Sequence, residues 1–528
     1  MRYISATEIV MTIAILALFI IFELTYRISF SPVGSQRNAL TGDIHSECRI
    51  WPDLSTVDPS LPIYASCPGD ISSPYVGDSY VLGNPQRCLA ATSRLDQYHE
   101  QAGRNWSEVK WGEVQSRCAS INPKLHPPEK SIHQRWQGSE HLRSRDNIRE
   151  KNDERSAIVL RTWDDYEYTD TRLAWLRALI AEVSLQRHDG YQVFFLVNIK
   201  DPELNLEDNS VYDTALQKFV PEEFRDMALL FNEGTLNAWY PLIQEHGAQD
   251  QMYQALQIFS SKFSEYSYVW QLEMDLRFTG HVHDTLAASS AYAKAQGRRN
   301  LWERNGRFYI PELHGSHENF LDAVDLEIGD TGVWGPAASS EFIPAGSPPP
   351  PRTEQDWGVG EEADLITFMP MIDPVGTDWI YETEVHGFKD GVQTPRRAAI
   401  ISITRSSRRL LQLVDEAQRQ RGQWLVSEAT LETFSLLHGL KAVTVPHPIA
   451  FAGNLTPEEL DSAIHKGPPS NKAGGKLPSM LYTKEGWVPG PWREASYWFT
   501  GNGAQAVWDS YVGGAQLPPM LLHPVKEK

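Results

Sequence analysis

Hydrophobic and polar positions take on a regular pattern from about residue 156. Residues 157–160 form a short apolar run that is typical of a buried strand, and a polar turn follows it. Thr169 or Asp170 can cap the helix that comes next, and residues 193–197 form a second apolar run. Between them, apolar residues recur at helical spacing at Leu173, Leu176, Ile180 and Val183. Strand, helix and strand in succession predict a βαβ unit with parallel pairing.

The same pattern returns near the end of the chain. Residues 431–438 are typical of a helix, and Gly439 is typical of a helix end. Residues 441–445 are typical of a strand, which Pro446 would end. A proline-rich break at residues 347–351 separates the two regions, and no second long apolar segment occurs, which excludes a multi-span transporter. These elements predict a mixed, mostly parallel α/β sheet flanked by helices, with a Rossmann-type nucleotide-binding core.

Residues 270–281 carry the most informative pattern. Read as a strand, this segment alternates cleanly between apolar residues on one side and Gln271, Glu273, Asp275 and Arg277 on the other. Glu273 and Asp275 would then project from one face, roughly 7 Å apart. Two such carboxylates can share a divalent cation that also holds a diphosphate. The alternative is the solvent-facing side of an amphipathic strand, on which Arg277 pairs with a neighbour.

Polar residues gather where the predicted parallel strands end. Arg161 and Asp164 follow the first strand, and Asn198 follows the second. In open parallel sheets, ligands bind beyond the carboxyl ends of the strands. We therefore expect these three residues to line a nucleotide pocket together with Glu273 and Asp275.

Two further positions are candidates for the same chemistry. Glu361 or Glu362, after two glycines, could act as a general base on an acceptor hydroxyl, or be acids in the first turn of a helix. His447, beside the last predicted strand, is a candidate metal ligand, although a lone histidine is more often structural.

The N-terminal segment predicts a single membrane anchor. Residues 9–22 are apolar apart from Thr12, which is short for a membrane span and also fits the core of a signal peptide. No pair of small residues that would mark a cleavage site follows Phe22, which favours an uncleaved anchor. We expect a cytosolic tip and anchor at residues 1–30, a stem at 31–155, the α/β domain at 156–455 and a C-terminal extension at 456–528.

Cysteine usage favours a lumenal location for the body of the chain. Four cysteines, all within the predicted stem, favour two disulfides in an oxidising compartment, although four unrelated thiols are the alternative. They are Cys48, Cys67, Cys88 and Cys118. Asn105 and Asn454 are N-glycosylation acceptors by sequence. The formal charge of −20 argues against a nucleic-acid partner.

Six motifs resemble the fungal domain-of-unknown-function family 3405. They are IVLRTWDDYEYT, WQLEMDLRFTGH, LWERNGRFYIPELHGSHENF, WGVGEEADLIT, PRRAAIISITRSSRRLL and HGLKAVTVPHP, in this order between residues 156 and 451. That family supplies no activity. The layout is also similar to that of Golgi type II glycosyltransferases of the GT-A fold, which have an anchor, a stem and a nucleotide-binding domain with an acid-x-acid motif.

The second resemblance implies a function. The motif here is Glu273-Met274-Asp275, with Glu in place of the usual first Asp. It implies a single-pass Golgi enzyme that transfers a sugar from a nucleotide sugar to a lumenal glycan or protein, with Mn²⁺ or Mg²⁺ as cofactor. The alternatives are a non-catalytic secretory-pathway binding protein of the same fold and a metal-dependent hydrolase.

Overall fold

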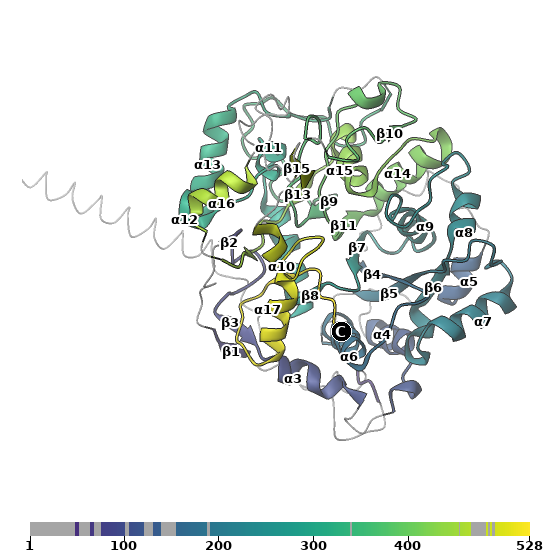
Figure 1. The fold of residues 1–528 in the computed structure, drawn as a ribbon. Coiled ribbons are helices and arrows are strands. Elements are labelled where there is room, and N and C mark those ends of the chain that lie inside the picture. Colours follow the sequence, from purple (N-terminus) through teal and green to yellow (C-terminus); the bar gives the residue numbers. More distant parts are fainter. Residues whose placement is uncertain are drawn as a thin grey trace, which may run out of the picture. The chain divides into compact units, whose positions relative to one another are not determined.

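A seven-stranded sheet lies at the centre of the computed structural model (Figure 1). The strand order is β13-β9-β11-β7-β4-β5-β6, and β11 is antiparallel to both of its neighbours while the other adjacent strands are parallel. The strands are β4 (Ser156–Trp163), β5 (Gln192–Asn198), β6 (Ala228–Phe231), β7 (Tyr268–Glu273), β9 (Leu365–Thr367), β11 (Thr404–Ser407) and β13 (Ala442–Thr444). The prediction of a mixed, mostly parallel sheet is confirmed.

The structure describes most of the chain after residue 47. The described residues are 48–51, 64–67, 75–100, 105–120, 130–138, 155–186, 191–337, 341–377, 379–453, 455–465, 482–483, 486–487 and 491–527. The predicted anchor and the acceptor Asn454 lie outside them. Among the described residues, no helix is both long and apolar enough to cross a membrane.

The first predicted βαβ unit is present. Strand β4 pairs in parallel with β5, and α6 (Asp170–Ile180) connects them, extended by the π-type turn η5 (Ala181–Leu185). The Thr169 side chain caps α6 by accepting a hydrogen bond from the backbone N–H of Arg172. The apolar side chains at the predicted positions are buried because α6 packs them against the sheet.

Helices cover both sides of the sheet (Figure 1). One side carries α4 (Trp111–Ser120) and α6. The other carries α9 (Gln254–Lys262), α14 (Arg408–Arg421) and α15 (Ser427–His438). Helix α15 ends at Gly439, whose positive φ of 64° is easy for glycine, as the pattern predicted. Because both faces are covered, even the polar Gln271 of β7 is buried.

The remaining elements surround this core. The helices are α3 (Ala91–Leu95), α5 (Ile132–Gln137), α7 (Asn209–Phe219), α8 (Glu233–Trp239), α10 (Val282–Ala295), α11 (Leu301–Asn305), α12 (Pro311–His314), α13 (His317–Ile328), α16 (Pro457–Ile464) and α17 (Gly503–Val512). The two-stranded pairs are β1 (Tyr64–Ser66) with β3 (Arg87–Leu89), β2 (Tyr75–Val76) with β14 (Ile449–Ala450), β8 (Arg277–Phe278) with β17 (Leu521–Leu522), β10 (Val385–His386) with β12 (Trp424–Leu425), and β15 (Tyr482–Thr483) with β16 (Gly486–Trp487).

The predicted continuous strand over residues 270–281 is wrong beyond Glu273. Strand β7 ends at that residue, and the backbone N–H of Leu276 closes a turn by donating to the Glu273 carbonyl. A short second strand, β8, follows and pairs with β17 near the C-terminus. The turn carries Asp275, so its position relative to Glu273 is set by the turn and not by strand alternation.

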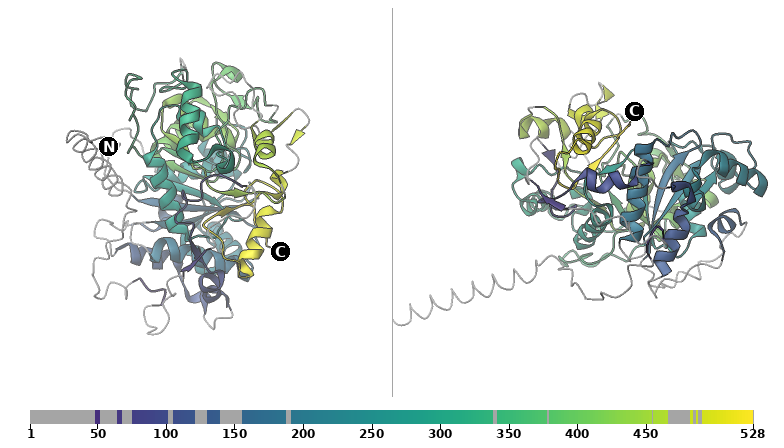
Figure 2. Two further views of the ribbon diagram at one scale, coloured as in Figure 1. Left: turned by 90° about the vertical axis from the view of Figure 1, so that its left-hand side faces the viewer. Right: turned by 90° about the horizontal axis from the view of Figure 1, so that it is seen from below.

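Parts of the predicted stem and of the C-terminal extension pack on the α/β domain. Arg94 and Glu182 form a buried ion pair, and the Trp111 indole N–H donates to a Glu223 carboxylate oxygen at 2.9 Å. Helices α3 and α17, from the two ends of the described chain, lie side by side (Figures 1 and 2). Of the predicted disulfides, Cys67–Cys88 is present and lies beside the β1–β3 pair, and Cys118 is buried in α4.

Candidate functional site

The candidate site lies at the carboxyl ends of the two central strands. Arg161 near the end of β4 is the register partner of Glu273 at the end of β7. In chain order, β4 is the first strand of the sheet, β5 and β6 extend from one side of it, and β7 adds to the other side. The strand order therefore reverses between β4 and β7, and ligands of open α/β sheets bind in the crevice at such a point.

Three side chains that could ligate a metal converge there. The His523 Nε2 atom lies 3.1 Å from a Glu273 oxygen and 3.2 Å from an Asp275 oxygen. The Arg161 guanidinium lies 3.5 Å from the other Glu273 oxygen and donates to the Ala248 carbonyl. The predicted pair of carboxylates is thus brought together, with a histidine that the sequence did not indicate.

The C-terminal segment fixes the position of His523. Pairing of β17 with β8 places the segment beside the turn that carries Asp275, and the Asp275 carbonyl accepts a hydrogen bond from the Val525 N–H at 2.8 Å. The Nδ1 atom of His523 contacts the Trp498 carbonyl oxygen, which can only accept, so Nδ1 carries a proton. This contact orients the ring so that Nε2 faces the two carboxylates.

The three groups shift one another's pKa values. Burial lowers the pKa of His523, but its hydrogen bonds to Asp275 and Glu273 outweigh this and raise it to about 10. Burial raises the pKa values of Glu273 and Asp275, but the hydrogen bond to His523 and its charge bring both below their usual range. As it stands, the cluster is a protonated imidazole held between two ionised carboxylates.

The same donor set fits a divalent cation. Adjacent ligands of an octahedral ion at 2.0–2.2 Å stand about 3 Å apart, and the Nε2–oxygen separations of 3.1 and 3.2 Å match this. Arg161 orients the Glu273 carboxylate and the Trp498 carbonyl orients the His523 ring, and residues around metal sites orient the ligands in the same way. Two carboxylates and one imidazole are donors that Mn²⁺ and Mg²⁺ accept, with the ion taking the place of the proton on Nε2.

The residues predicted to bind a nucleotide lie at the same edge of the sheet. Asn198 ends β5 opposite Trp163, and its carbonyl accepts from the Asp164 N–H at 3.0 Å. The Asp164 carboxylate accepts from the Lys200 backbone N–H, so it shapes the loop after β5. Trp163 exposes 41% of its surface beside these polar groups.

Glu361 and Glu362 are not brought to this cluster. Both residues precede β9. Strand β9 is antiparallel to β11, and β11 is antiparallel to β7, so β9 runs in the same direction as β7 and β4. The two glutamates therefore lie at the amino-terminal edge of these strands, opposite the cluster. Glu361 binds Arg298 at 2.7 Å, and Glu362 binds Lys294 at 2.9 Å and Arg405 at 3.1 Å. Ion pairs occupy both side chains, which does not favour a role as catalytic base.

His447 follows β13 and lies at the carboxyl edge, but it is not one of the three converging ligands. Its ring stands edge-on to Phe368 and to Tyr497, at 5.6 and 4.5 Å between centroids. Burial lowers the pKa of His447 to about 3, so the ring is neutral. Tyr497 in turn contacts His523, at 5.9 Å between centroids, and thereby connects the two histidines.

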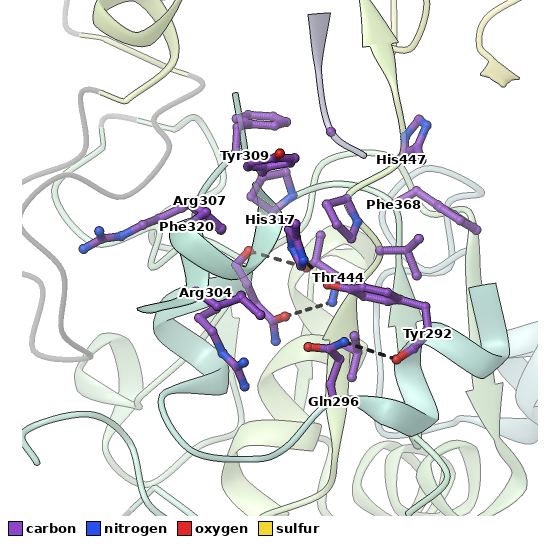
Figure 3. Close-up of a pocket in the computed structure, with 18 of the residues that line it drawn as sticks. Tyr292, Gln296, Arg304, Arg307, Tyr309, His317, Phe320, Phe368, Thr444 and His447 are labelled. Carbon is purple, nitrogen blue, oxygen red and sulfur yellow. Dashed lines mark hydrogen bonds between the residues drawn. The ribbon is translucent and has the colours of Figure 1, made fainter. Parts of the chain in front are cut away.

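A pocket opens on the other side of His447 (Figure 3). His447 and Phe368 lie on one side of it, and Tyr309, His317 and Phe320 lie on another. Tyr292 and Gln296 of α10 are at the end away from His447. The lining combines aromatic and aliphatic side chains with polar groups such as Arg304 and Thr444, which is typical of a ligand pocket.

Glu428 is a second residue at this edge that the sequence did not indicate. It lies in the first turn of α15, where the neighbouring Ser427 bonds to the loop before α9. Burial raises the pKa of Glu428 to about 7; the charges of Glu273 and Asp250 add to this, and Arg161 opposes it. These effects show that Glu428 shares the electrostatic environment of the three-residue cluster.

Among the predicted glycosylation acceptors, Asn105 is described and exposed. Its side chain amide donates to Glu108 at 2.7 Å, and the Ser107 hydroxyl donates to it.

Comparison with known proteins gives one match. The family model described as "Protein of unknown function (DUF3405)" matches residues 79–527, a range that includes both Glu273 and His523. No curated protein and no solved structure matches the chain.

Proposed function

The chain belongs to the DUF3405 family, whose description assigns no activity, and from the geometry of its site we propose a metal-dependent glycosyltransferase of GT-A type. The observation that carries the proposal is the convergence of Glu273, Asp275 and His523 at the point where the strand order reverses. In open α/β sheets, ligands, nucleotides among them, bind in the crevice at such a point. A nucleotide sugar presents a diphosphate there, and two carboxylates with an imidazole supply the ligands for an ion that it needs.

Each residue has a role in this proposal. Glu273, Asp275 and His523 hold Mn²⁺ or Mg²⁺, which when bound neutralises charge on the diphosphate leaving group. Arg161 lies beside Glu273 and orients its carboxylate. Asp164 and Asn198 line the side of the crevice that would take the nucleoside. The acceptor hydroxyl bonds to the anomeric carbon, the bond to the diphosphate oxygen breaks, and the hydroxyl proton passes to a carboxylate.

Glu428 is the carboxylate that we propose for proton acceptance, in place of Glu361 or Glu362. It lies at the carboxyl edge of the sheet, where the negative charge of Glu273 helps to raise its pKa. A pKa of about 7 suits a group that must exchange a proton near neutral pH.

The proposed location is a Golgi-type secretory membrane, with the N-terminal segment as anchor and the sheet domain in the lumen. The Cys67–Cys88 disulfide supports an oxidising compartment. The partners would be a nucleotide sugar and a lumenal glycan or protein acceptor.

The test is donor cleavage by the purified full chain with a panel of nucleotide sugars, with and without Mn²⁺. We expect metal-dependent turnover of one donor that Glu273→Gln or Asp275→Asn lowers by at least about 100-fold. The matched control is Glu265→Gln, which breaks a pair with Arg135 at 2.6 Å near the opposite end of β7. Equal turnover in Glu273→Gln and the control would contradict the proposal.

One observation favours a second candidate, a non-catalytic binding protein. His523 and Arg161 together already balance the charge of the two carboxylates, so the cluster is electrostatically complete as a network of ion pairs. A protein of this kind would bind a glycan or partner without any turnover. Product analysis also separates transfer to an acceptor from hydrolysis, the third alternative.

A further inference from the structure

A second group of metal-ligating side chains lies at the start of α10, outside the site described above. His281, His283 and Asp284 each offer one ligand atom, and these atoms lie within 4.8 Å of one another. The Asp284 Oδ1 atom is 3.2 Å from the His283 Nδ1 atom and 3.7 Å from the His281 Nδ1 atom. Local chain geometry explains the closeness, because the three residues share the first turn of the helix and its cap.

The protonation of His281 leaves a lone pair directed toward this group. Its Nε2 atom lies 3.0 Å from the Gln186 Oε1 atom, and an amide oxygen only accepts. Nε2 therefore carries the proton and Nδ1 is the unprotonated nitrogen. A ring whose far N–H is held by an oxygen is the arrangement that metal-ligating histidines adopt. The Asp284 N–H is 3.4 Å from Nδ1, a weak cap that a metal could replace.

The two histidines of this group are buried, whereas Asp284 is partly exposed to solvent. Both imidazoles are buried, at 5% and 7% exposure, whereas the Asp284 side chain is 40% exposed. An ion can therefore reach the group from the Asp284 side and is shielded on the other. The second Asp284 oxygen accepts a hydrogen bond from the Tyr64 hydroxyl at 3.3 Å, which connects the group to the β1–β3 pair beside the disulfide.

We propose that His281, His283 and Asp284 form a second metal site, one that takes Zn²⁺. Two imidazoles and one carboxylate make a nitrogen-rich set of the kind that zinc prefers, with a fourth position left for water. The Glu273 cluster is richer in oxygen and suits Mn²⁺ or Mg²⁺ instead. The zinc site would be structural: it ties the first turn of α10 to the disulfide-linked β1–β3 pair through Asp284 and Tyr64.

The test measures zinc in the full chain after chelation, reloading with Zn²⁺ and dialysis. We expect one tightly held zinc per chain, lost in the double variant His281→Gln/His283→Gln and kept in Glu273→Gln/Asp275→Asn. The control for a histidine change is His386→Gln, since His386 pairs with Glu384 at the surface. Replacing zinc by Co²⁺ should give the visible absorption of a tetrahedral ion in the wild type and the control.

If the double variant does not fold, Asp284→Asn tests the zinc site instead. This change keeps the shape of the side chain and removes its charge, and we expect at least tenfold weaker zinc binding, since even the loss of an outer-shell partner costs about 10–100-fold. A wild-type chain that retains no zinc after dialysis would overturn the proposal, as would unchanged zinc in both Asp284→Asn and a folded double variant. A hydrogen-bonded helix cap would then be the whole role of the group.

Discussion

Replacing His523 by Gln tests the central cluster most directly. The change removes the positive charge between Glu273 and Asp275 and leaves two ionised, partly buried carboxylates side by side, with Arg161 still 3.5 Å from Glu273. Removing one partner of a fully buried ion pair costs about 3–5 kcal/mol, and the partial exposure of the two carboxylates lowers this to about 2–3 kcal/mol here. For a compact unit of roughly 480 residues, the unfolding entropy is about 1 kcal/mol/K, so we expect Tm to fall by about 2–3 °C.

The pH dependence of this loss has a definite sign. The folded pKa of His523, about 10, lies above its ordinary value of about 6.5, so its contribution is complete below pH 6.5 and is lost as the pH rises toward 10. The lowered pKa values of Glu273 and Asp275 make their contributions present above about pH 4 and lost in acid. The difference in Tm between wild type and variant should therefore be largest at about pH 5–6.5.

The assay is thermal unfolding in EDTA from pH 5 to 9, followed by the same series with Mn²⁺. Metal at 100 times its Kd for the wild type should stabilise the wild type by up to about 2.7 kcal/mol. It should stabilise His523→Gln less, because one proposed ligand is missing, and Glu273→Gln/Asp275→Asn least, because two are changed. The control is His386→Gln, which breaks an exposed histidine–glutamate pair and should cost less than about 1 kcal/mol. A Tm loss of under 1 °C, or one that grows from pH 6.5 to 9, would refute the reasoning.

Three further predictions follow from the placement of charged groups. Glu428→Gln should lower donor turnover by at least about 100-fold while Glu361→Gln leaves it unchanged, as a comparison of the two variants in the donor assay would show. Because the folded pKa of Glu428 is raised from about 4.5 to about 7, the fold loses stability as the pH rises between these values. Glu428→Gln should therefore stabilise by about 1–3 kcal/mol at pH 8 and by little at pH 4, measured by urea unfolding. Arg177→Met should cost about 3–5 kcal/mol, because it leaves Glu223 buried without its 2.6 Å partner, whereas Lys200→Met at an exposed pair should cost under about 1 kcal/mol in the same assay.

The fold could be predicted from local patterns where those patterns are long. Helix α6 has a cap at Thr169 and apolar residues at helical spacing, and the strands on either side are unbroken apolar runs. The turn at Asp275 could not be predicted, because the residues around it alternate as they would in a strand. The hydrogen bond from Leu276 to Glu273 closes the turn, and β8 after it pairs with β17, which is far away in the chain and cannot be read from the local pattern.

The candidate site could be predicted in part, for a reason that depends on strand direction. Arg161 and Glu273 end parallel strands, so they had to meet at one edge of the sheet. Glu361 and Glu362 come before β9 instead of after it, which places them at the other edge; recognising the short strand Leu365–Thr367 would have shown this. His523 follows a two-residue strand in a proline-containing segment, and no periodicity there indicates a ligand.

The contacts of the two ends of the described chain bear on where the functional unit begins and ends. The family match runs from residue 79 to 527, well beyond the predicted α/β domain of 156–455. On the N-terminal side, Arg94 pairs with Glu182, whose second oxygen accepts from the Val282 N–H at the start of α10. On the C-terminal side, β17 and the residues after it supply His523 and the Val525 hydrogen bond to Asp275. A domain cut at residue 455 would lack His523 and expose the turn that carries Asp275. The stem and extension expected from sequence therefore include parts that hold the site in its geometry, and the site is a property of the whole matched region.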